Sequence, residues 1–96
     1  MTTVWAFTSG SYSDYRVECL FTTRELAIEY AARRSGQPVE WWTRYMDIND
    51  EIDALPNRDT KHRRALVGES NTMYCALRDL DYGITTLDLY DSLPAV

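Results

Sequence analysis

The sequence has few of the residues from which reactive sites are usually built. Its 96 residues include one histidine, one lysine and two cysteines, and they contain no glycine-rich phosphate loop, G-x-S-x-G elbow or C-x-x-C pair. Cys19 and Cys75 are too few for a disulfide framework, so we expect buried, reduced thiols. These absences argue against an enzyme and against a metal ion or other cofactor.

Long apolar runs and excess positive charge are also lacking. No segment approaches the roughly 18–20 apolar residues of a membrane span, and residues 1–4 show no basic region ahead of an apolar one. The net charge is −5, which argues against general nucleic-acid binding because such binding depends on neutralising phosphates. We therefore expect a cytoplasmic protein that binds neither membranes nor nucleic acids.

The first quarter of the chain has the pattern of a β-hairpin. Residues 4–8 are rich in strand-forming side chains, and residues 9–14 have turn chemistry, with Gly10 supplying permissive dihedral angles. Alternation of apolar and polar side chains then predicts a second strand over residues 15–21. Its predicted inward side chains are Tyr15, Val17, Cys19 and Phe21, and its predicted outward ones are Arg16 and Glu18.

A helix is predicted over residues 23–35. Thr22 is a preferred N-cap, and Glu25 three residues later completes a capping box. Phe21 and Leu26 have the spacing of a hydrophobic staple. Gly36 then suits the left-handed residue that follows a helix. A helix of this length is marginal alone, so we expect it to pack on the sheet.

The remainder of the chain predicts more strands. Residues 39–48 fit a helix by the spacing of Val39, Trp42 and Met46, but their aromatic content favours a strand, which we prefer. In that strand Trp42 would face inward with Met46 and Ile48, and Trp41 outward with Tyr45. Residues 50–71 form a long polar connection that could include a short helix from Asp59 to Gly68. Residues 72–80 and 84–90 alternate as strands around a turn at 81–83.

Together these elements predict one α+β domain spanning residues 1–96. The predicted sheet is antiparallel, with four to five strands in the order ββαβββ and one main helix on one face. A β-grasp-like arrangement, in which the third strand pairs parallel to the first, is the alternative.

The amino-terminal motif resembles a family of small uncharacterised proteins from bacteriophages and their bacterial hosts. The resemblance covers about the first third of the chain, through Ser9-Gly10, Tyr12-Ser13-Asp14-Tyr15, Phe21-Thr22-Thr23, Glu25 and Ala27. It implies the strand–turn–strand–helix order and a phage or prophage setting, and it brings no known catalytic residues.

Several polar clusters are candidate sites. Residues 47–58 begin like a calcium loop, but Ile52 stands where glycine is needed and Arg58 where a bidentate glutamate is needed. His62 lies among basic residues at 61–64, which suits a contact with an acidic partner or a solvated helix face better than catalysis. Turn formation and edge protection explain the aspartates at positions 79, 81, 88 and 91.

The favoured function is therefore protein interaction. In the phage setting that the resemblance implies, the protein would bind a host protein and inhibit or redirect it. The Tyr-, Ser- and Gly-rich turn suits a contact surface. The predicted interface residues are Tyr12, Asp14, Trp41, Tyr45, His62, Arg63 and Arg64. The alternative is a small-ligand or nucleotide-binding module in which residues 55–71 form a lid. The sequence is also compatible with a homodimer.

Overall fold

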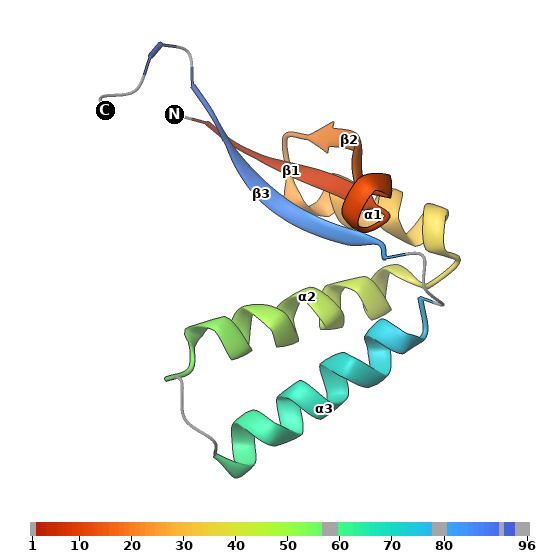
Figure 1. Cartoon of the computed structure of the whole chain (residues 1–96), viewed down its shortest axis with the longest axis vertical. Helices are drawn as coiled ribbons and strands as arrows, with labels where there is room; N and C mark the ends of the chain where they lie inside the picture. The colour runs from red at the N-terminus through yellow and green to blue at the C-terminus, as the bar shows by residue number, and fades with distance from the viewer. Residues whose placement is uncertain (1, 57–59, 78–80, 91, 94–96) are drawn as a thin grey trace.

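The computed structural model describes residues 2–56, 60–77, 81–90 and 92–93. Three strands form one antiparallel sheet, with the first strand of the chain at its centre (Figure 1). In spatial order they are β2 (Arg16–Phe21), β1 (Thr2–Ser9) and β3 (Gly83–Leu89). A short 3₁₀ helix, Tyr12–Asp14, lies in the connection between β1 and β2.

Three helices separate the second strand from the third. They are α1 (Arg24–Ser35), α2 (Val39–Ala54) and α3 (Lys61–Cys75). α1 packs on one face of the sheet, whereas α2 and α3 lie side by side as a helical hairpin that extends away from it (Figure 1). The core lies where α1, the start of α2 and the sheet meet. Its buried members are Phe7, Ile28, Ala31, Trp42, Leu77 and Tyr82.

The predicted sheet of four to five strands with one main helix is wrong, because the described chain has three strands and three α-helices. Residues 39–48 belong to α2, where helical spacing directs Trp42 and Met46 to the core. α3 spans Lys61–Cys75, so the strand predicted from Thr72 is wrong. A helix is present where a short one was considered within the 50–71 connection, but it is longer, and residues 50–54 belong to α2. The β-grasp alternative is wrong too, since both strand pairings are antiparallel.

The predicted hairpin and first helix are confirmed, with a shift at the helix start. Thr23 rather than Thr22 is the N-cap, and its hydroxyl accepts a hydrogen bond of 3.2 Å from the amide of Leu26. With Thr23 as the cap, Leu26 and not Glu25 is the third residue of the helix. The predicted capping box and hydrophobic staple therefore do not have the required spacing. Gly36 does adopt the left-handed conformation, at φ 77°, and its amide bonds to the carbonyl of Ala32. The α2–α3 connection uses Thr60 as the α3 cap, whereas the predicted cap, Asp59, lies outside the described residues.

A β-bulge in β2 breaks the strict alternation predicted for that strand. Cys19 pairs with Phe7, but Val17 pairs with Thr8, so Glu18 is an extra residue between them. Glu18 therefore joins Cys19 on the side of α1, where both contact the hydroxyl of Tyr30. Val17, predicted to face inward, lies on the opposite face and is exposed.

The opposite face of the sheet keeps apolar side chains in contact with solvent. Phe7 points to α1, so its neighbours along β1 point the other way, as do their partners on the flanking strands. Leu20, Leu87 and Leu89 on that face are 57%, 43% and 59% exposed. Within the described residues, then, only the α1 side of the sheet has a full covering layer.

Candidate functional site

The loop between β1 and β2 is held in a tight conformation by Gly10. Gly10 has φ +80°, and a Cβ placed there would lie 2.2 Å from the carbonyl oxygen of Asp14. The amide of Asp14 donates a 3.0 Å hydrogen bond to the carbonyl of Ser11. Only glycine suits this combination of left-handed backbone and close approach. The loop backbone therefore holds Asp14 and its neighbours at fixed positions beside the start of β2.

Glu18 is the charged centre of the adjoining surface. Its two carboxylate oxygens accept hydrogen bonds from Nε and Nη2 of Arg34, at 2.8 and 2.9 Å. The hydroxyl of Tyr30 lies 3.2 Å from Oε1, and only 10% of the Glu18 side chain is exposed. The hydrogen bond from Arg34, with further ones from Ser9 and Tyr30, lowers the pKa of Glu18 to about 2 in spite of desolvation, which raises it. Glu18 is thus ionised at neutral pH and anchors Arg34.

Arg34 connects this pair to the segment before β3. Its guanidinium lies 5.3 Å from the ring centroid of Tyr82, which in turn packs 5.2 Å from the ring of Phe7. Hydrogen bonding to Glu18 raises the pKa of Arg34 further above its ordinary value. Three segments that are distant in sequence are therefore joined through one guanidinium.

These groups surround an open cleft of about 570 Å³. Most of its lining is polar, and the loop, the start of β2, α1 and the segment before β3 all contribute to it. The lining residues are Ser9, Gly10, Ser13, Asp14, Tyr15, Arg16, Glu18, Arg34 and Tyr82. Its volume falls in the range of roughly 300–1,000 Å³ that is typical of small-ligand sites.

Glu18 makes the stability of the fold depend on pH in acid. Its pKa is about 2 in the folded state, against 4.5 for an unperturbed glutamate. The paired carboxylate therefore stabilises the fold fully above pH 4.5, and this contribution is lost as the pH falls towards 2. We expect the free energy of unfolding to fall more steeply with acid in the wild type than in Glu18→Gln, as measured by urea denaturation at fixed pH.

Glu29→Gln is the matched control for that measurement. Glu29 pairs with Arg33 on the outer surface of α1, where both side chains are more than half exposed and solvent screens the pair. The control should keep the wild-type dependence on pH. An unchanged dependence in Glu18→Gln would show that the Glu18–Arg34 pair does not stabilise the fold.

The predicted interface residues Trp41 and Tyr45 lie together on α2. Their rings stack at 5.2 Å with an interplanar angle of 25°, and both pack against the core as partly buried side chains. Trp42 is fully buried, as predicted, although a helix and not a strand places it there. Burial raises the pKa of Tyr45. Trp41 was predicted to face outward, but part of its side chain is covered by the core.

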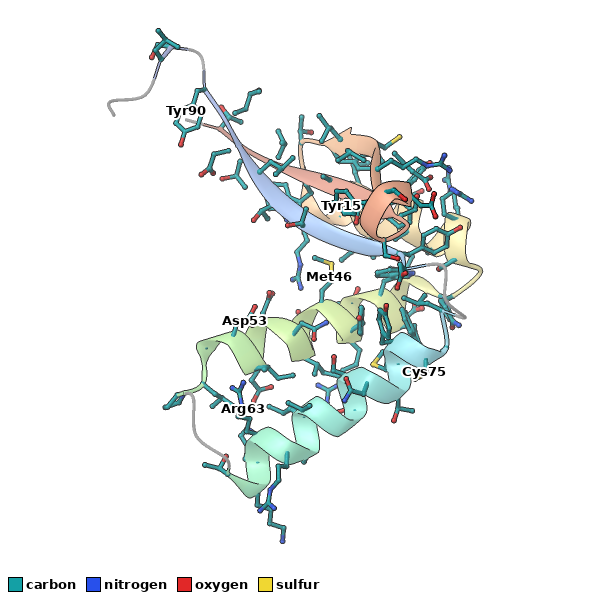
Figure 2. The ribbon with its side chains drawn as sticks, viewed as in Figure 1. Tyr15, Met46, Asp53, Arg63, Cys75 and Tyr90 are labelled. Carbon is teal, nitrogen blue, oxygen red and sulfur yellow. The ribbon has the colours of Figure 1, made fainter. Side chains whose placement is uncertain are left out.

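The predicted basic residues lie at the far end of the helical hairpin. His62 Nε2 is 3.1 Å from Glu51 Oε1, and Arg63 donates a 3.2 Å hydrogen bond to the carbonyl of Ile52. Both contacts join α3 to α2. Figure 2 shows Arg63 well away from Tyr15. Arg64, in the same first turn of α3, shares this remote position.

The structure thus brings only part of the predicted site together. Asp14 lines the cleft, and Tyr12 begins the neighbouring 3₁₀ helix, although its side chain lies outside the described part. Sequence reasoning missed four lining residues, Arg16, Glu18, Arg34 and Tyr82. The one available signal was a charged residue, Glu18, next to the predicted core position Cys19. The bulge, which the sequence did not predict, turns the Glu18 carboxylate towards α1.

The two cysteines differ in exposure. Cys19 is partly buried, but Cys75, at the end of α3, is exposed, so the prediction of two buried thiols is wrong. α3 packs along α2, and no described residue of the predicted lid at 55–71 lines the cleft.

Among the described residues, no group of three His, Cys, Asp or Glu side chains has a metal-binding arrangement. None of the described helices is long and apolar enough to cross a membrane.

Comparison with known proteins adds no relative. No family model, no curated protein and no solved structure matches this chain.

Proposed function

We propose that the protein is a non-enzymatic interaction protein that binds an extended, net basic segment of another protein along β3. The observation that supports this is that β3 has no partner strand on its outer edge among the described residues and carries exposed leucines on the open face of the sheet. In the phage or prophage setting implied by the amino-terminal motif, the partner would be a host protein.

β3 has the features of a strand that accepts another. Within the described chain it pairs with β1 alone, and its register runs without interruption from Gly83 to Leu89. Its sequence has no proline and one charged residue, Asp88. The other edge strand, β2, is interrupted by the bulge at Glu18, a feature that discourages strand addition. Main-chain bonds along β3 would supply affinity, and Leu87 and Leu89 would select apolar side chains.

Charge identifies the kind of segment that fits. The sequence from residue 81 to residue 91 contains three aspartates and no lysine or arginine, and the whole chain has a net charge of −5. Pairing β3 with a second copy of itself would bring these like charges together, whereas a basic segment would be attracted. The proposed occupant is therefore a partner segment with apolar side chains at alternate positions and a net positive charge.

The proposal is tested with a displayed library of extended peptides that alternate apolar and variable residues. We expect the selected peptides to be basic, to bind more weakly as salt increases, and to shift the NMR amide signals of Gly83 to Leu89. Methylating alternate backbone nitrogens of a selected peptide should abolish binding. Leu89→Ser should weaken it, because Leu89 lies on the open face.

Leu93→Ser is the matched control. Leu93 is 96% exposed and lies beyond β3, so its replacement should leave peptide affinity unchanged. Binding that maps away from β3, or that tolerates backbone methylation, would overturn strand addition. A concentration-dependent dimer formed through β3 would show that the occupant is a second copy instead.

A further inference from the structure

We propose that the cleft beside the 9–16 loop binds a small zwitterion of the α-amino acid class, with its carboxylate at Arg16 and its ammonium at Asp14. This site is separate from the β3 edge, and the inference does not depend on strand addition there.

The charges that line the cleft are balanced. Two are positive, Arg16 and Arg34, and two are negative, Asp14 and Glu18. Arg34 and Glu18 neutralise each other through two hydrogen bonds, so they supply a structural wall and no net charge. A ligand with a single charge would meet one attractive and one repulsive unpaired group, whereas a ligand with both charges can satisfy both.

Asp14 and Arg16 are available to such a ligand. Both are exposed, and neither forms an ion pair with any described residue. They stand two residues apart where the loop enters β2, so they approach the cleft from one short, backbone-fixed segment. Carboxylate–guanidinium and ammonium–carboxylate contacts are charge-assisted hydrogen bonds, the stronger class of hydrogen bond in proteins.

The walls of the cleft are organised before any ligand arrives. The close approach at Gly10 fixes the loop, and Arg34 is held by Glu18 on one side and by the ring of Tyr82 on the other. Ser13 adds a hydroxyl to the lining, and the exposed Tyr15 ring offers apolar area for a ligand side chain. Preorganised groups reduce the entropy lost on binding.

The test is an NMR titration of the full chain with single amino acids at neutral pH. We expect at least one to give saturable shifts at Ser13 to Arg16. Its N-acetyl derivative lacks the ammonium and its amide lacks the carboxylate, so each should bind about tenfold more weakly. Inorganic phosphate should give no saturable shift. Saturation by phosphate in place of amino acids would assign a simple anion site and overturn the zwitterion, as would blocked derivatives that bind equally well.

Arg16→Gln and Asp14→Asn should each reduce affinity about tenfold while leaving the melting temperature unchanged, because neither side chain has an ion-pair partner in the described chain. Arg16→Lys keeps the positive charge and should restore part of the binding. Arg33→Gln, which changes an arginine on the outer surface of α1, is the control and should bind like the wild type. No saturable shift with any amino acid, or full affinity in both cleft variants, would overturn the proposal.

Discussion

Replacing Trp42 by alanine should lower the free energy of unfolding by about 3–5 kcal/mol, as measured by urea denaturation. Trp42 is completely buried and is among the largest fully buried side chains. Its ring meets Phe7 edge to face at 6.3 Å, and its Nε1 donates a 2.8 Å hydrogen bond to Ser35 Oγ at the end of α1. Truncation would open a cavity at the junction of α1, α2 and the sheet, and remove a hydrogen bond as well.

Trp41→Ala is the matched control, since it removes an identical side chain from the adjacent position. Trp41 is only partly buried and packs on Tyr45 and Trp42 at the margin of the core, so its loss should destabilise the protein less than the loss of Trp42. Equal destabilisation by the two substitutions would contradict the burial difference and place both rings in one core. A selective effect of Trp41→Ala on partner binding would support its predicted place in an interface.

Gly10→Ala should destabilise the protein by at least about 2 kcal/mol. The left-handed conformation alone costs roughly 1–2 kcal/mol for a residue with a Cβ. The new Cβ would also lie 2.2 Å from the backbone oxygen of Asp14, so the loop has to move. Urea denaturation gives the loss in stability, and NMR shifts at Ser13 to Arg16 report the displaced loop.

Two other glycines separate these two effects. Gly36 has nearly the same φ, +77°, but a Cβ added there would meet nothing within 4 Å, so Gly36→Ala should show the conformational cost alone. Gly68 lies inside α3 with open space around it, and Gly68→Ala should stabilise the protein by up to about 1 kcal/mol. If Gly10→Ala cost no more than Gly36→Ala, close packing in the loop would not contribute to stability.

The part of the fold that could be predicted is the part specified locally. The turn at Gly10, the helix after Thr23 and the exit at Gly36 depend on neighbouring residues, so their signals stand in the sequence itself. The burial of Trp42 was also predictable, because Trp42 lies on the same face as Met46 whether the segment is a helix or a strand.

The helical hairpin could not be predicted because each helix depends on the other. Residues 39–48 are rich in aromatic side chains that suit either element, and only the contact with α1 and α3 decides for a helix. The facing surface of α3 is weakly apolar, and part of the seam is polar, with Ser70 donating to Asn49 at 2.7 Å and Arg44 pairing with Glu69. Such a seam leaves little periodic signal in α3.

The candidate cleft was beyond prediction for a different reason. Glu18 enters it through a bulge that alternation alone does not reveal, and Arg34 and Tyr82 arrive from α1 and from the segment before β3. The sequence pattern predicts the turn that carries Asp14 as a contact surface, so that side of the cleft was foreseen. Tertiary structure brings the other groups together, and their residue types are ordinary ones for exposed strand and helix positions.

The central position of β1 has a consequence for synthesis on the ribosome. Thr2 pairs with Leu89, so β1 leaves the ribosome well before β3, the strand that covers its second edge. At roughly 5–20 residues per second, that interval amounts to several seconds. During it the β1–β2 hairpin exposes one open backbone edge and an apolar face. Nascent chains that stop before residue 83 should therefore aggregate, or occupy chaperones, more readily than chains that have passed residue 89.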